Sequence, residues 1–310
     1  MGIEKIGTSI GKEIIAWTRT GKSMLATRPV KVNIQGLKYT PRLTEDVFVN
    51  TKQSLKDIIS KHNLNSYINE TYFIGEGCEG AVYKIGNTPY ALKVPHIGDI
   101  STQGTIRGKS VDISKLNLSV TPQDRVNNIV GHIGDAQILK YIEGENIIEG
   151  VSSSSQSREK IMKAINNLSI DNIKSYFQTL ANANRAGMMH DYSGSNSIIN
   201  CTTGKITPID FWPGQDFKLL NSLIDQCAIV PKRVGGTDNQ NNLLKKGIRA
   251  LLEMVKEGQI SAKEVDISQV RLIFNETATA KDMLKLCESF TKDSSVENIN
   301  RILAELKNIV

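Results

Sequence analysis

The sequence predicts an α+β protein with short antiparallel strands in its first half and mostly helices in its second half. Three observations lead to this class. Runs of β-forming residues alternate with glycine-containing turns between residues 71 and 142, and apolar residues recur at helical spacing from residue 158 onward. The length of 310 residues allows one large domain, or two lobes with an extension.

The composition is that of a folded chain without a membrane span. Hydrophobic residues make up 39% of the chain, and no apolar run reaches membrane-spanning length. The formal charge is +6, but the basic residues are scattered and only 5% of residues are aromatic, which argues against dedicated nucleic-acid binding. The cysteines stand singly, so a reduced compartment is expected. No Sec-type signal peptide is expected at the start.

The most informative stretch begins at Tyr72 and reads YFIGEGCEGAVYKIGNTPYALK. Its glycines, Gly75, Gly77 and Gly80, stand in G-x-G-x-x-G spacing. A dinucleotide-binding loop needs a helix directly after its glycines, whereas the residues from Val82 onward are strand-like. We therefore expect these glycines to join two strands of a hairpin.

Strands are expected on both sides of these glycines, over 71–74 and 81–85. Gly86 opens the next turn, and residues 89–94 form a third strand that carries Lys93. The alternative interpretation is an ordinary glycine-rich turn beside an exposed lysine.

The remaining elements follow from periodicity and from helix start and stop signals. The expected elements are a helix over 51–64, a loop over 99–118, a helix over 121–129, a strand over 136–142, a flexible connection over 152–157, helices over 158–168 and 169–186, a strand over 205–211, and helices over 217–228, 243–256, 280–290 and 296–309.

A second group of polar residues follows the helix over 169–186. His190 and Asp191 come first, Asn196 stands five residues after Asp191, and Asp210 lies near the end of the strand over 205–211. Three of these residues have an ordinary alternative role. Asp191 could be a helix-end turn residue, Asn196 a loop cap, and Asp210 a strand-end turn former. A His-Asp pair also occurs in metal-dependent phosphohydrolases, but the chain has only 4 histidines to accompany it.

Taken together, these motifs resemble those of the protein kinase superfamily. The hairpin resembles the glycine-rich loop over ATP, and A-L-K ending at Lys93 resembles V-A-I-K. The spacing from Asp191 to Asn196 resembles the catalytic loop, and Asp210 with Phe211 resembles the start of D-F-G. The pieces occur in kinase order.

The resemblance implies a bilobal kinase-like fold. A small antiparallel β lobe would occupy 66–143, and a helical large lobe with a C-terminal helical extension would occupy 144–310. An N-terminal extension over 1–65 would hold a helix and a candidate secretion signal.

The resemblance also implies the activity and the role of each residue. The activity would be ATP- and Mg²⁺-dependent transfer of the γ-phosphate to a protein hydroxyl, Ser or Thr being favoured. The implied catalytic residues are Asp191 and Lys93, the implied metal ligands are Asn196 and Asp210, and the implied ATP contacts are Gly75, Gly77, Gly80, Val82, Ala91, Lys93, Lys140, Ile142 and Ile198.

The chain departs from the kinase pattern around its catalytic motif. Met189 stands where the motif has His, His190 where it has Arg, and Trp212 where D-F-G has Gly. Few residues separate Asp210 from the next expected helix, so there is no room for an activation loop.

The acid that usually pairs with the strand lysine is also missing. No Glu occurs between Asp99 and Glu143, so Asp124, with Asp112 as the alternative, is the expected partner of Lys93.

A kinase without an activation loop resembles the NleH/OspG type of bacterial effector kinase. That likeness implies secretion into a host cell by a specialised system and a host protein as substrate, with the cytoplasm as the alternative location. Two other functions stay open. One is a small-molecule phosphotransferase of the aminoglycoside- and choline-kinase type, and the other is an inert kinase-fold binding module.

Overall fold

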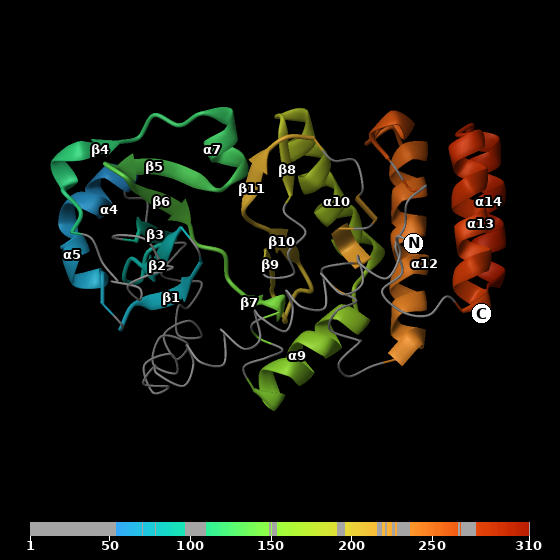
Figure 1. Ribbon diagram of the computed structural model, residues 1–310, viewed down its shortest axis with the longest axis horizontal. Helices are drawn as coiled ribbons and strands as arrows, with labels where there is room; N and C mark the ends of the chain where they lie inside the picture. Colours follow the sequence, from blue (N-terminus) through green and yellow to red (C-terminus); the bar gives the residue numbers. More distant parts are fainter. Residues whose placement is uncertain are drawn as a thin grey trace, which may run out of the picture. The chain divides into compact units, whose positions relative to one another are not determined.

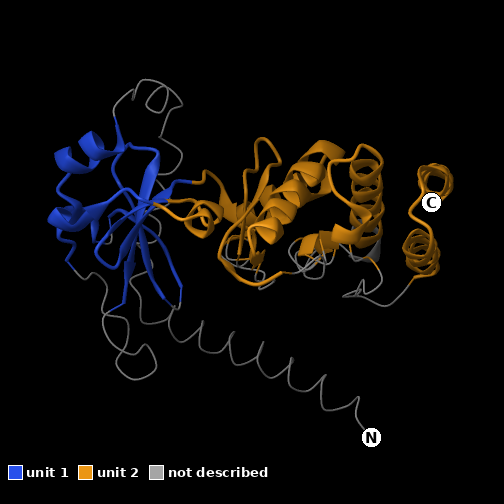
Figure 2. Ribbon diagram, turned by 90° about the horizontal axis from the view of Figure 1, so that it is seen from above, with its two compact units in different colours: residues 1–119, 130–141 blue, residues 120–129, 142–310 orange. Residues whose placement is uncertain are grey.

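The chain forms two compact units in the computed structural model. The structure describes residues 54–69, 71–77, 79–96, 110–148, 150, 154–190, 196–215, 219–220, 222–224, 227, 236–265, 267 and 277–309. The first unit comprises residues 1–119 and 130–141, and the second comprises 120–129 and 142–310 (Figure 2). The candidate secretion signal lies outside the described residues.

The first unit contains an antiparallel sheet, and the second is mostly helical, so the α+β class is confirmed (Figure 1). The sheet has six strands in the order β1-β2-β3-β6-β5-β4. Its strands are β1 (Phe73–Glu76), β2 (Gly80–Lys84), β3 (Tyr90–Pro95), β4 (Leu116–Asn117), β5 (Ile129–Ile133) and β6 (Ala136–Lys140). The three strands around the glycines and the strand before residue 142 were all expected from the sequence.

Alternation of side chains along these strands builds the core of the first unit. Tyr83, Leu92 and Ile138 are fully buried, and they lie opposite one another in the β2–β3 and β3–β6 ladders. Helix α4 (Leu55–Lys61) adds Ile59 to the same cluster. The expected helix over 51–64 is broken because the backbone is extended at His62, and α5 (Leu64–Tyr67) follows.

The second unit is built on helices, and all but the first of them bury side chains in one apolar core. These are α7 (Pro122–Val126), α9 (Ser155–Asn166), α10 (Ile170–Arg185), α12 (Gly236–Lys256), α13 (Ala278–Lys292) and α14 (Val296–Asn308). Tyr176 and Phe177 of α10 are fully buried in this core, and α10 packs against α12. Gly187, with φ 74, follows the end of α10, as the sequence predicted.

Short strands line the other side of α10, which contacts β8 and β10 (Figure 1). One sheet has the order β10-β9-β7 and the other pairs β11 with β8. The strands are β7 (Glu145–Asn146), β8 (Met188–His190), β9 (Ser197–Ile199), β10 (Ile206–Pro208) and β11 (Phe211–Pro213). The prediction of one strand over 205–211 is wrong, because Asp210 has a left-handed backbone that ends β10.

A bidentate ion pair ties α10 to the 3₁₀ helix η3 (Ala262–Glu264). Arg185 Nε donates to Glu264 Oε1 at 2.6 Å, and Nη2 donates to Oε2 at 3.0 Å. The hydrogen bonds from Arg185 lower the pKa of Glu264 below its ordinary value. A carboxyl with a lowered folded pKa stabilises the fold above its unfolded pKa, and this contribution is lost as the pH falls through the folded pKa.

Replacing Glu264 with Gln is therefore expected to lower the free energy of unfolding at pH 7 and to have less effect in acid. The difference should be at most about 1 kcal/mol, because the Arg185 side chain is 45% exposed and solvent screens the pair. Urea unfolding of both proteins between pH 7 and pH 3 measures it. A difference that stays constant over this range would contradict the assignment.

Candidate functional site

The glycine hairpin connects β1 to β2, and its glycines have different structural roles. The Gly77 N–H donates to the Gly80 carbonyl at 3.0 Å. A Cβ at Gly80 would come within 2.4 Å of the Val94 carbonyl oxygen, whereas a Cβ at Gly75 or Gly77 would meet no atom within 4 Å. Packing of the sheet therefore requires Gly80. Because Gly75 and Gly77 have no side chain and face open space, they leave the backbone of the turn accessible to a ligand.

Three of the predicted ATP-binding residues share one face of the sheet. Val82 lies opposite Lys93 in the β2–β3 ladder, and Ala91 precedes Lys93 by two residues on β3. Because side chains alternate along a strand, Val82, Ala91 and Lys93 lie on the same face. The other face carries Tyr83 and Leu92 of the core.

The remaining predicted adenine contacts lie at the ends of strands or in the second unit. Lys140 ends β6, where it lies opposite Tyr90 and has an exposed side chain. Ile142 is half-buried at the start of the second unit, and Ile198 is half-buried in β9. Their contact with adenine stays a prediction.

The partner of Lys93 is Glu79 from the glycine hairpin. Lys93 Nζ donates to Glu79 Oε2 at 2.8 Å. Within the first unit, Lys93 pairs with Glu79 and not with Asp112, so that alternative is wrong. The pairing with Asp124, a residue of the second unit, stays a prediction. Asp112 and Asp124 accept hydrogen bonds at the starts of their own short helices, the positions that Asp favours.

Asn196 and Asp210, the two predicted metal ligands, lie at the same end of the β9–β10 ladder. Asn196 precedes β9 and Asp210 follows β10, and the strands are antiparallel with Ser197 opposite Pro208. The Ile209 N–H extends the ladder by donating to the Asn196 carbonyl at 2.9 Å. We call Asn196 and Asp210 the strand-end pair.

Asp191, the predicted catalytic residue, lies outside the described residues. His190, directly before it, ends β8 and lies opposite Phe211 in β11. The described residues on either side of the segment 191–195 are His190 and Asn196. His190 is paired with Phe211, the residue after Asp210. The pairings place the two flanking residues, His190 and Asn196, beside the backbone of Phe211 and Ile209, the neighbours of Asp210.

Asp210 has an uncommon backbone conformation. Its φ of 64° lies in the left-handed region, which non-glycine residues seldom adopt. Such a conformation costs about 1–3 kcal/mol and persists only where the surroundings determine it. It turns the chain from β10 into β11, which pairs with a different strand.

His190 is part of a buried chain of polar groups that the sequence did not indicate. Its Nε2 lies 2.8 Å from the Asn196 carbonyl oxygen, which only accepts, so Nε2 carries a hydrogen. Its Nδ1 lies 3.3 Å from Ser222 Oγ, which is 2.7 Å from the Tyr176 hydroxyl. His190 thus contacts the backbone of Asn196, and these two residues flank the segment 191–195.

Asn127 is a second residue that the sequence did not indicate. Its side-chain amide forms two hydrogen bonds with the backbone of Phe211, 84 residues away in the chain. Local patterns carry no signal for such a distant contact. The one local hint is the Asn127-Asn128 pair near the end of the helix expected over 121–129.

The strand-end pair offers oxygen atoms that suit a hard cation. Mg²⁺ prefers carboxylate and carbonyl oxygens, which Asp210 and Asn196 supply. Among the residues that the structure describes, no group of three His, Cys, Asp or Glu side chains could hold a metal ion. The amide–carboxylate pair stays the cation site that the sequence predicted.

The described cysteines do not offer a nucleophile. Burial raises the pKa of Cys227 and of Cys287 to about 12, and it raises the pKa of the half-buried Cys201 above its ordinary value. Only a thiolate is an effective nucleophile, so these groups stay inert near neutral pH.

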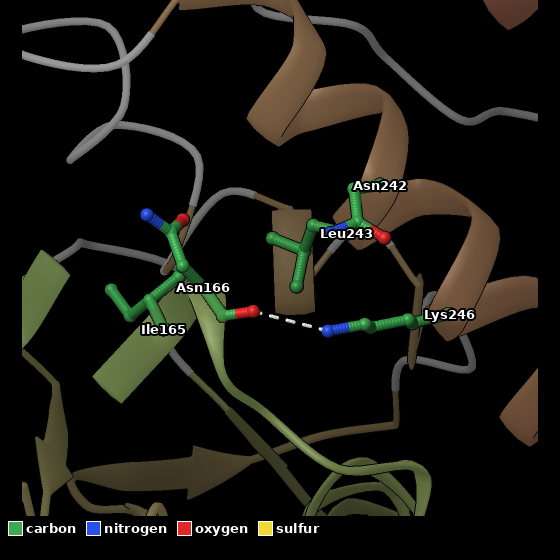
Figure 3. Close-up of a pocket in the computed structure, with 5 residues that line it drawn as sticks. All are labelled: Ile165, Asn166, Asn242, Leu243 and Lys246. Atoms are coloured by element: carbon green, nitrogen blue, oxygen red, sulfur yellow. Dashed lines mark hydrogen bonds between the residues drawn. The ribbon is translucent and has the colours of Figure 1, made fainter. Parts of the chain in front are cut away.

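A small cavity between α9 and α12 is not a ligand site (Figure 3). Its volume of about 10 Å³ admits no more than a single water. Lys246 Nζ donates to the Asn166 carbonyl at 3.1 Å, where a cation at the end of α9 is favourable. Burial lowers the pKa of Lys246.

Comparison of the chain with protein-family models finds no match, and comparisons with curated proteins and with solved structures find none either. Within the part of the chain that the structure describes, every helix is too short or too polar to span a bilayer.

Proposed function

We propose that this chain is an ATP- and Mg²⁺-dependent phosphotransferase of the protein kinase type, with a bilobal kinase-like fold. The observation that carries the proposal is the strand-end pair, in which Asp210 has a strained backbone beside Asn196. Strained non-glycine residues cluster at functional sites. Further support comes from His190 and Asn196, which flank the segment that begins with Asp191: His190 lies opposite Phe211, and the Asn196 carbonyl accepts from Ile209.

The first unit would contact the nucleotide. Gly75 and Gly77 would let the backbone approach the phosphates, and Lys93 would neutralise charge on the α- and β-phosphates. Val82 and Ala91, on the same face as Lys93, would contact the adenine.

The second unit would perform the chemistry. Asn196 and Asp210 would hold Mg²⁺, which when bound neutralises charge on the phosphates. Asp191 would orient the acceptor hydroxyl and accept its proton as the hydroxyl oxygen bonds to the γ-phosphorus of ATP. The bond from that phosphorus to the β-phosphate oxygen would break in the same transfer, and ADP would leave. His190, through the Asn196 carbonyl, would keep the ends of the segment 191–195 together.

The ion pair between Lys93 and Glu79 is compatible with these roles. Both side chains are partly exposed, and an exposed pair contributes at most about 1 kcal/mol. A polyphosphate carries more negative charge than one carboxylate, so it can displace Glu79 from Lys93 at small cost.

A protein hydroxyl, Ser or Thr being favoured, is the proposed acceptor. Strand β11 starts directly after Asp210 and residues 219–220 are already helical, which leaves only residues 214–218 between them. This supports the likeness to effector kinases without an activation loop. Secretion into a host and a host protein as substrate belong to the same proposal.

Incubation of the full chain with γ-labelled ATP and Mg²⁺ tests the proposal. Three reactions should contain a host-cell lysate, a panel of aminoglycosides and choline, or the protein alone, with Lys93→Ala as the control. Label on a protein that depends on Lys93 supports a protein kinase. Label on a small molecule supports the small-molecule phosphotransferase. Nucleotide binding without any transfer supports the inert binding module.

The glycine hairpin gives a prediction that separates folding from nucleotide binding. Gly80→Ala should lower the free energy of unfolding by roughly 1–3 kcal/mol, because its Cβ would overlap the Val94 carbonyl. Gly77→Ala should leave stability unchanged, because its Cβ meets open space. It should weaken ATP binding, because its Cβ would keep the phosphates away from the backbone N–H groups of the turn. The loss should be roughly tenfold or more, which is the effect of one hydrogen bond to a charged group.

Urea unfolding and titration with a fluorescent ATP analogue measure the two effects. Equal losses of stability in the two variants would contradict the packing argument. Unchanged nucleotide affinity in Gly77→Ala would show that this turn does not contact phosphate.

A further inference from the structure

The side chain of Asn127 holds the backbone of the residue that follows Asp210. The Phe211 N–H donates to Asn127 Oδ1 at 2.8 Å, and Asn127 Nδ2 donates to the Phe211 carbonyl at 3.1 Å. Both hydrogen bonds are partly buried. One amide group thus satisfies the donor and the acceptor of a single residue.

These two hydrogen bonds show which edge of β11 Asn127 occupies. The N–H and C=O of one strand residue point to the same side of the strand. On its other side, β11 pairs with β8, where Phe211 lies opposite His190. Asn127 therefore takes the place of a neighbouring strand at the outer edge of β11.

The hydrogen bond to the Phe211 N–H also constrains Asp210. This N–H belongs to the peptide group that joins Asp210 to Phe211, and a peptide group is planar. Fixing the orientation of that plane fixes the ψ angle of Asp210. On the other side of Asp210, the Ile209 N–H bonds to the Asn196 carbonyl. The left-handed turn at Asp210 is therefore anchored on both sides.

Helix α7 places Asn127 for this contact. Thr121 and Asp124 form a capping box at its start, with Pro122 in the first turn. Asn127 is the C-cap, and Asn128 follows with φ 60°, a conformation that Asn tolerates at a helix end. The short helix thus has defined signals at both ends.

We propose that Asn127 is a positioning residue that holds the Asp210 carboxylate in place for the metal ion. This inference rests on the proposed function, because it assigns Asn127 a role at the proposed metal site. Groups that orient a metal ligand typically affect metal affinity roughly 10- to 100-fold.

The test uses the full chain and two substitutions of Asn127. Asn127→Ala removes both hydrogen bonds, whereas Asn127→Asp keeps an acceptor for the Phe211 N–H and loses the donor. Asn128→Gly is the matched control, because glycine adopts the same left-handed conformation in the same turn. Binding of a fluorescent ATP analogue is measured over a range of Mg²⁺ concentrations, with circular dichroism to verify folding.

We expect the half-saturating Mg²⁺ concentration to rise by roughly 10- to 100-fold in Asn127→Ala and by less in Asn127→Asp. Binding without Mg²⁺ should be the same in all proteins, which a general loss of structure would not reproduce. Asn128→Gly should match the wild type. Amide hydrogen exchange of a peptide covering residues 209–213 should quicken in Asn127→Ala.

Two results would overturn the inference in distinguishable ways. If the wild type binds nucleotide with Mg²⁺ dependence and folded Asn127→Ala and Asn127→Asp show the same dependence, Asn127 does not position the metal ligand. If the wild type shows no Mg²⁺-dependent nucleotide binding, the proposed function fails and the role of Asn127 fails with it. Should Asn127→Ala not fold, the result for Asn127→Asp decides.

Discussion

Asp210→Asn is expected to lower Mg²⁺-dependent phosphoryl transfer by roughly 100- to 1,000-fold or more, the usual effect of removing a group that stabilises charge in the transition state. Asn keeps the shape of Asp and tolerates the left-handed conformation at this position. The fold should therefore stay intact while the negative charge that would hold Mg²⁺ is lost. Transfer of label from γ-labelled ATP over a range of Mg²⁺ concentrations measures the effect.

Asp210→Gly is the matched control for backbone strain. Glycine adopts φ 64° without the penalty that a side chain incurs, so this variant should be more stable than the wild type by about 1 kcal/mol and should also lack transfer. Asp210→Ala should lose transfer as well, with some loss of stability. Full activity in well-folded Asp210→Asn or Asp210→Gly would remove Asp210 from the metal site.

The sequence predicted the parts of the fold that depend on local patterns. The three strands around the glycine hairpin were expected because β-forming runs alternate with turn residues there. Helix α10 was expected because its apolar residues recur at helical spacing and Gly187 follows it. The buried positions of Tyr176 and Phe177 agree with this periodicity.

The sequence did not predict the interruption at Asp210. The residues KITPIDF alternate as one strand would. Pro208 is a local signal against a continuous strand, but it does not place the interruption at Asp210. The interruption comes from a ladder that ends at Ile209 and from hydrogen bonds to Phe211. Both are contacts between distant segments, which override local propensity.

The candidate site was predicted only in part, because some of its contacts also join distant segments of the chain. Motif spacing made Lys93, Asn196 and Asp210 candidate site residues, and their roles stay predictions. The sequence did not predict Glu79 as the partner of Lys93, because the expected partner was an acid on a helix. Glu79 lies in the glycine hairpin instead. The structural role of Gly80 was also hidden, since close approach of the Val94 carbonyl is visible only in three dimensions.

Asp191→Asn is expected to lose phosphoryl transfer while it keeps nucleotide affinity. Asp191 would act on the acceptor hydroxyl and would not contact ATP, so only the chemical step should suffer. General base catalysis contributes roughly 100- to 10,000-fold, which sets the expected loss of kcat. The apparent affinities for the ATP analogue and for Mg²⁺ should stay within about twofold of the wild type.

Lys93→Ala provides the contrast that makes this prediction specific. Lys93 would contact the phosphates directly, so its removal should lower nucleotide affinity as well as transfer. The ion pair with Glu79 is partly exposed, so the loss should not come from unfolding. If both variants lose nucleotide affinity equally, the division between a binding lysine and a catalytic aspartate is wrong. If Asp191→Asn keeps full transfer with an intact Lys93, Asp191 is not the catalytic base and the kinase-type mechanism fails at its central step.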